Sequence, residues 1–252
     1  MALVAAAVVV VLAVLSAGKH RNFDRCYAEA FLPRSPLGLT LQLAGVVLLA
    51  IGGFLSLAHW VQSPLSAEGQ RTVSVAWAGL GILALLAAAG IYFVVLKMRR
   101  GQPILSAWVT LPGFAGCLWI MSNYYENWAA NPSLGQYLIP MLGALLSMLA
   151  CFFMGGFAFE KGRVTATLLC ALAGSALNLM ALADGLPLAD TALYLGMTFY
   201  LLASASALAD SDARPETAAP ACSAHCATCA GCAPMGTLPA KEEKKKSGGT
   251  AS

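Results

Sequence analysis

Four cysteines near the C-terminus form the motif with the clearest potential for chemistry. Cys222, Cys226, Cys229 and Cys232 lie within 11 residues, and His225 stands among them. Thiolates at this density are ligands for Zn, Cu(I) or an iron–sulfur cluster. The spacing lacks the longer central loop of paired zinc motifs, and the intervening Ala, Thr and Gly offer little support around a metal. Two alternatives therefore stay open, a metal site and a thiol-rich spacer without metal.

A second group of residues could bind a small ligand at the outer side of a membrane. Aromatic rings and a carboxylate gather at two connectors, and a proline and an amide lie inside apolar segments. The candidate ligand-binding residues are Trp60, Trp77, Pro112, Tyr124, Tyr125, Glu126, Trp128 and Asn178. Proline breaks the hydrogen bonding of a helix, and broken helices often line transporter sites. The alternatives are an aromatic belt at the interface, a packing kink and, for Asn178, a hydrogen bond between helices.

Asp, Glu, Lys, Arg and His are absent from the middle of every apolar segment. Pumps, voltage sensors and proton-coupled transporters need such groups inside the membrane. Intramembrane catalysis needs an embedded acid–base pair or a set of metal ligands, and no such motif is seen. We therefore predict a protein that is not an enzyme and has no catalytic residues. Cys117, Cys151 and Cys170 are expected to be ordinary buried, small apolar side chains.

Seven apolar segments can be marked as candidate membrane spans. They are residues 2–17, 37–57, 73–96, 104–122, 137–159, 164–183 and 188–208. Hydrophobic residues make up 59% of the chain and charged residues 11%, which leaves too little polar surface for a soluble domain. We predict an all-α, polytopic membrane bundle of seven transmembrane helices over residues 1–209. The first segment is short for a span and could instead be a signal peptide.

Basic residues indicate how the bundle is oriented. Of the 15 Lys and Arg residues, 14 fall in connectors on one side of the predicted membrane, and only Arg71 falls on the other. Since basic loops stay in the cytoplasm, we expect a multi-pass protein of the cell membrane with its N-terminus outside and its C-terminus cytoplasmic. The net charge of +3 is spread over loop ends that can contact anionic lipid, so it does not predict nucleic-acid binding.

Two connectors and the tail have recognisable patterns. Within residues 18–36, apolar side chains recur at helical spacing from about Asn22 to Phe31, which predicts a short amphipathic helix in the inner interface or on a partner. Asp184 to Pro187 have the composition of a tight turn. Residues 210–252 are rich in Ala, Pro, Gly, Ser and Lys, so we expect a disordered cytoplasmic tail.

The stretches SNYYENWAANPSLGQYL and ALADGLPLADTALYL give residues 37–208 an outline that resembles multi-pass bacterial membrane proteins of no named family. This resemblance implies no activity and no site. Three functions remain as hypotheses. The first is a sensor or transport component that binds a small ligand, the second a metal- or thiol-responsive protein that uses the cysteine tail, and the third a structural or accessory subunit. The partners expected are the lipid bilayer, a small ligand and a second membrane subunit.

Overall fold

In a computed structural model of the chain, the described residues are 27–33, 35–64, 75–100, 102, 106–125, 134–159 and 162–212. Their elements are α2 (Tyr27–Phe31), α3 (Pro36–Gln62), α4 (Val75–Arg99), α5 (Ser106–Asn123), α6 (Leu134–Ala158), α7 (Val164–Ala181), a 3₁₀ turn η2 (Leu182–Asp184) and α8 (Leu188–Asp212). All the regular secondary structure of the described residues is thus helical, as predicted. The predicted first span and most of the predicted tail lie outside the described residues.

Five of the six long helices are apolar and long enough to cross a membrane, namely α3, α4, α6, α7 and α8. Helix α5 is not among them, although its bounds match the predicted fourth span. It carries Pro112 inside the helix and ends in Ser122 and Asn123, which lower its hydropathy. The membrane character of the bundle is therefore supported, whereas the count of seven spans and the orientation remain predictions.

Local sequence explains where the helices begin and end. The Ser35 hydroxyl accepts a hydrogen bond from the Gly38 amide at 3.0 Å, and Pro36 occupies the first helical position of α3. Both features are typical of a helix N-terminus. Between α7 and α8, Gly185 adopts φ 68°, a left-handed conformation that glycine adopts without a steric penalty. The tight turn predicted at residues 184–187 is therefore confirmed.

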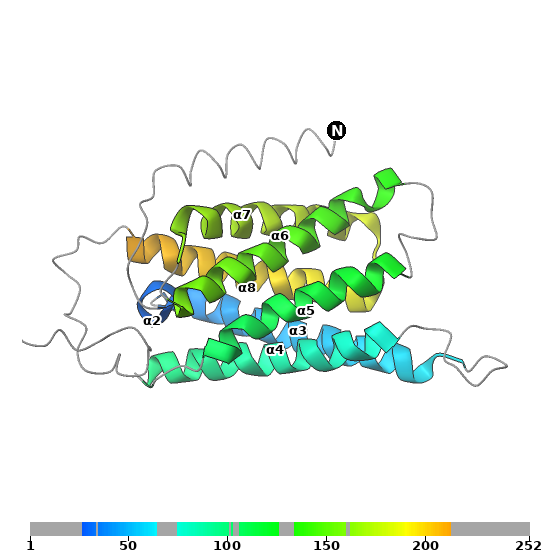
Figure 1. Cartoon of the computed structure of the whole chain (residues 1–252), viewed down its shortest axis with the longest axis horizontal. Coiled ribbons are helices and arrows are strands. Elements are labelled where there is room, and N and C mark those ends of the chain that lie inside the picture. Colours follow the sequence, from blue (N-terminus) through cyan, green and yellow to red (C-terminus); the bar gives the residue numbers. More distant parts are fainter. Residues whose placement is uncertain are drawn as a thin grey trace, which may run out of the picture.

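The six long helices form a closed ring in space. Each packs against its neighbours in the order α3, α4, α5, α6, α7 and α8, and α8 packs against α3. Figure 1 shows α6 and α7 along one side of the bundle, α3 and α4 along the other, and α5 and α8 between them. In α8, 72% of an 18-residue apolar stretch is buried inside the bundle, against 39% of the corresponding stretch in α3. Helix α8 therefore supplies much of the interior.

Glycines let the backbones of α3 and α8 approach closely. A Cβ atom on Gly45 would lie 2.9 Å from the carbonyl oxygen of Gly196, and one on Gly196 would lie 2.8 Å from the Leu49 nitrogen. Real side chains do not tolerate such distances to backbone. Small residues at helix interfaces allow the close packing on which membrane bundles depend, because lipid offers no hydrophobic drive for helix association.

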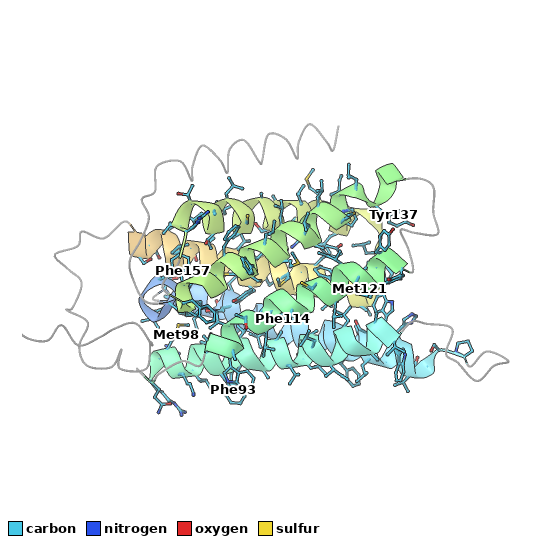
Figure 2. All side chains as sticks on the ribbon, viewed as in Figure 1. Phe93, Met98, Phe114, Met121, Tyr137 and Phe157 are labelled. Atoms are coloured by element: carbon cyan, nitrogen blue, oxygen red, sulfur yellow. The ribbon has the colours of Figure 1, made fainter. Side chains whose placement is uncertain are left out.

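The outer surface of the ring is apolar. Phe93 on α4, Phe114 and Met121 on α5 and Phe152 on α6 are each at least 48% exposed, and three of them are labelled in Figure 2. In water this would be an unusually large apolar surface. Such side chains fit contact with lipid hydrocarbon.

Helix α2 lies at the end of the ring where α6 and α8 end. Its Tyr27, Ala30 and Phe31 are buried, and the Phe31 ring meets the Phe157 ring edge-on at 5.2 Å. The amphipathic helix predicted here thus exists over Tyr27–Phe31. Its apolar side chains contact the protein, which corrects the expectation that they face the membrane interface.

Candidate functional site

A buried group of four residues brings a carboxylate together with hydrogen-bonding side chains, and we name it the Asp190 cluster: Trp119, Asn123, Asp190 and Tyr194. It lies at the end of the ring where α5 ends and α8 begins, which we name the Asp190 end; the opposite end, with α2, is the Tyr27 end. Asp190 is 1% exposed, and the other three members are also buried. A carboxylate so deeply buried inside an apolar bundle calls for a physical explanation.

Two side chains of α5 donate hydrogen bonds to the carboxylate. Trp119 Nε1 lies 3.1 Å from Asp190 Oδ1, and Asn123 Nδ2 lies 3.5 Å from the same atom. Asn123 Nδ2 also donates to the Trp119 carbonyl oxygen at 3.2 Å. Trp119 and Asn123 are four residues apart on one helix, so they share a face. They therefore reach Asp190 together.

Tyr194 completes the cluster from α8. It follows Asp190 by one helical turn, and its ring lies 4.3 Å from that of Trp119, tilted by 58°. Its hydroxyl donates to the Pro140 carbonyl oxygen of α6 at 2.9 Å. The cluster thus joins α5, α6 and α8 through buried polar contacts.

The free energies involved show that the position of Asp190 at the start of α8 does not by itself explain its burial. Its place in the first turn of α8 lets the helix dipole stabilise a negative charge by up to about 2 kcal/mol. A hydrogen bond to a charged group contributes about 1.5–3 kcal/mol, and the Asn123 contact at 3.5 Å is at the limit of such a bond. Burying a charge costs several kcal/mol. The dipole alone does not offset that cost, so the contacts of Asp190 within the protein, among them the Trp119 bond, must contribute.

A small apolar cavity lies next to the cluster. Its volume is about 20 Å³, and its lining comes from α3, α4, α5 and α8: Leu49, Leu80, Ala84, Ala87, Pro112, Ala115, Gly116, Trp119, Leu193 and Met197. This is room for about one water molecule, but an apolar lining gives water no partners. Trp119 belongs to both places, because its ring lines the cavity and its N–H reaches Asp190. Pro112 is buried here and does not lie at an outer mouth.

The other predicted ligand residues are spread over the Asp190 end. Tyr124 and Tyr125 follow α5, are 52% and 58% exposed, and contact each other with ring centres 5.9 Å apart. Trp77 is buried and meets the His59 ring at 5.7 Å, and Trp60 is partly buried against the core. None of these four predicted residues lines the cavity. Glu126 and Trp128 lie outside the described residues.

Asn178 lies between α6 and α7 and is fully buried. Its Nδ2 donates to Ser147 Oγ at 2.8 Å, while its Oδ1 has no hydrogen-bond partner among the described residues. A Cβ on Gly143 would lie 2.6 Å from that Oδ1, so the two helices are close at this level. The geometry is that of a hydrogen bond between helices, the alternative considered for this residue.

A second buried polar group lies at the Tyr27 end. The hydroxyl groups of Tyr27 on α2 and Tyr200 on α8 form a hydrogen bond, and Ser204 bonds to Tyr200. Burial raises the pKa of Tyr27 above its ordinary value, and the bond to Tyr200 opposes that shift. Tyr27 therefore stays neutral at physiological pH, and the group ties α2 to the bundle.

The cysteine motif, Cys222 to Cys232 with His225, lies outside the described residues. Within the part of the chain that the structure describes, no three His, Cys, Asp or Glu residues are grouped so that they could hold a metal ion. Cys151 and Cys170 are buried as expected, but Cys117 is exposed. The prediction of burial is wrong for Cys117, because the side of α5 that carries this residue faces away from the interior of the bundle.

Comparisons with protein-family models, curated proteins and solved structures find no match to this chain. The function must therefore be inferred from the site alone. Sequence reasoning missed Asp190 and Trp119. The signal that points to Asp190 is an acidic residue two positions inside an apolar segment.

Proposed function

We propose that this chain is a non-enzymatic integral membrane protein that binds a small ligand at its Asp190 end, as a sensor or as the binding part of a transport system. The observation that carries the proposal is the buried carboxylate of Asp190. Ionisable groups inside membrane bundles are costly, and they commonly mark ligand, ion or proton sites. The exposed Tyr124 and Tyr125 directly follow the helix that covers the carboxylate, and aromatic surfaces of this kind often line ligand sites.

The proposed orientation places this end outside the cell membrane and the tail in the cytoplasm. All Lys and Arg residues in the described ranges, Lys97, Arg99, Arg100 and Arg163, belong to the Tyr27 end. His59 is at the opposite end, where no Lys or Arg is described. This distribution agrees with the rule that basic residues stay cytoplasmic. A ligand of the Asp190 end would therefore come from outside.

Ligand binding can be tested by thermal unfolding of the purified protein in detergent, against a library of small cationic, neutral and anionic compounds. A ligand that binds only the folded state raises the Tm. The responses should weaken in Trp119→Phe and in Tyr125→Ala, and should persist in Ser206→Ala, a control at the Tyr27 end of α8. Equal responses in all variants, or none in the wild type, would argue against the proposal.

The cysteine tail supports a second candidate function, metal or thiol sensing. Four thiols and a histidine within 11 residues form an adequate ligand set for Zn, Cu(I) or an iron–sulfur cluster. Elemental analysis and visible absorbance of anaerobically purified protein test this, with the Cys226→Ser/Cys229→Ser double variant for comparison. Near-stoichiometric metal that the double variant lacks would support it. A metal-free wild type would leave the tail as a spacer.

A further inference from the structure

We infer that α5 and α6 together bind a soft monovalent metal ion, Cu(I) or its analogue Ag(I), through the sulfur atoms of Cys117, Met148 and Met121. This site lies in the bundle, apart from the Asp190 cluster and from the cysteine tail, so the inference goes beyond both proposed functions. It comes from a contact between two sulfur atoms, the position of a third, and the charge of the two helices.

Two of the three sulfur atoms are already in contact. The Cys117 thiol donates to the Met148 thioether, with Sγ and Sδ 3.3 Å apart. Met148 can lie this close to α5 because a glycine faces it, and a Cβ on Gly116 would lie only 3.0 Å from the Met148 Cβ. Thiolates and thioethers are soft ligands that suit Cu(I). The pair thus offers one thiol and one thioether, from two helices, to a single ion.

Met121 supplies a third sulfur atom from α5. It follows Cys117 by four residues, and residues at this spacing share a helix face. Long side chains in helices lean toward the N-terminus of the helix, so that of Met121 extends toward the turn that carries Cys117. Both side chains are exposed, and Met121 is labelled in Figure 2. Three sulfur atoms can therefore converge on one ion.

Only a small movement is needed to admit the ion. Metal–sulfur bonds are about 2.3 Å long in zinc sites, and at this length two ligands of a planar three-coordinate ion lie about 4.0 Å apart. The two sulfur atoms would therefore separate by about 0.7 Å from their present 3.3 Å. Methionine has three rotatable bonds and can adjust by this much. On binding, the metal replaces the thiol proton, which is released to water.

The charge of the two helices selects a monovalent ion. Neither α5 nor α6 contains Asp, Glu, Lys, Arg or His, so the Cys117 thiolate is the one negative charge that these helices offer. Cu(I) with one thiolate is neutral, whereas Zn(II) would keep a positive charge, which is costly in apolar surroundings. Hard cations such as Ca²⁺ need several oxygen ligands. The sulfur ligands and the charge thus agree on one class of ion.

The test uses the full chain with the four tail cysteines, Cys222 to Cys232, changed to serine, so that the tail does not compete. This tail-serine protein is titrated anaerobically in a neutral maltoside detergent against a chromogenic Cu(I) chelator, whose absorbance reports the copper that it loses. We expect the protein to withdraw one Cu(I) per chain. An excess of Ag(I) should abolish that binding, and an equal excess of Zn(II) should leave it unchanged.

Substitutions in the tail-serine protein locate the ion. Cys117→Ser removes the thiolate, so Cu(I) affinity should fall at least tenfold. Met148→Leu and Met121→Leu conserve the side-chain volume and remove only the thioether, so each should lower the affinity severalfold. Cys170→Ser and Met180→Leu make the same exchanges on α7, and these control variants should bind Cu(I) like the tail-serine protein.

A second readout needs no substitution at the site, so it decides the question even where a variant does not fold. Cys117 is exposed, so N-ethylmaleimide should label it in the detergent-solubilised tail-serine protein, as located by mass spectrometry of its peptide. A bound metal occupies the thiolate and blocks this reaction. Cu(I) and Ag(I) should therefore slow the labelling at least tenfold, and Zn(II) should not.

Several results would overturn the inference. They are a tail-serine protein that takes no Cu(I) from the chelator, equal Cu(I) affinity after Cys117→Ser, and protection of Cys117 by Zn(II) as strong as that by Cu(I). Loss of binding in Cys117→Ser without any change in Met148→Leu and Met121→Leu would indicate the reaction of a single thiol, and it would overturn the three-sulfur site. None of these results bears on the Asp190 end, which uses other residues.

Discussion

At the residue scale, the bond between Trp119 and Asp190 is expected to contribute to stability, because it donates a hydrogen bond to a buried carboxylate. Sequence reasoning found the polar residue Asn178 and anticipated its contact between helices. It missed Asp190, since the alternation of apolar and polar residues does not reveal which side of α8 faces the interior. Only the three-dimensional structure, in which side chains of α5 contact the start of α8, shows that a residue next to a polar turn is 1% exposed.

Replacement of Trp119 by Phe should lower the free energy of unfolding by about 1.5–3 kcal/mol, the contribution of a hydrogen bond to a charged group. The ring is retained in large part, so the loss reports mainly the N–H donor. Trp77→Phe is the matched control, because Trp77 is equally buried and its Nε1 has no hydrogen-bond partner among the described residues. Unfolding measured in mixed micelles should show a larger loss for Trp119. Equal losses would mean that the bond to Asp190 contributes little.

At the element scale, helix positions were predictable and helix partners were not. The apolar segments marked the six long helices, because a bilayer requires long apolar runs with internal hydrogen bonding. The ring order depends on which glycines face each other, such as Gly45 and Gly196. Those contacts join residues far apart in the chain, and no local pattern specifies them.

The α3–α8 contact leads to a prediction with a matched control. Gly196→Ala places a methyl group 2.8 Å from the Leu49 nitrogen, so the helices must separate, at a cost of about 1–3 kcal/mol. Gly79→Ala meets nothing closer than a Leu118 methyl group at 3.4 Å and improves helix propensity by up to about 1 kcal/mol. The Tm should therefore fall for Gly196→Ala and stay equal or rise for Gly79→Ala. The reverse order would show that α3 and α8 do not meet at this glycine.

Helix α2 offers a second test at this scale. Phe31 is 1% exposed and packs on Phe157, so Phe31→Ala should destabilise the protein by about 3–5 kcal/mol, as for other buried aromatic residues. Tyr27→Phe removes only the hydroxyl that bonds to Tyr200, which should cost about 1 kcal/mol. Both changes are measured by thermal unfolding. An unchanged Tm for Phe31→Ala, together with weaker lipid binding, would instead indicate that α2 anchors the protein to the membrane.

At the scale of the whole molecule, the helical membrane bundle could be predicted because composition and segment length act over the entire chain. The candidate site could be predicted only in part. Its exposed aromatic residues, Tyr124 and Tyr125, follow from their place in a connector, whereas the Asp190 cluster requires three helices that meet in space. The asymmetry of charge links the two levels, because the rule that basic residues stay cytoplasmic predicts which end of the bundle faces outward.

That orientation can be tested with a membrane-impermeant maleimide on intact cells. The four tail cysteines, Cys222 to Cys232, should react only after the membrane is permeabilised, because the basic connectors keep the tail in the cytoplasm. In a variant with these four changed to serine and with Gln62→Cys at the exposed end of α3, labelling should occur without permeabilisation. Labelling of the tail in intact cells would show that the bundle has the opposite orientation. The Asp190 end would then face the cytoplasm, and its ligand would have to be sought among cytoplasmic compounds.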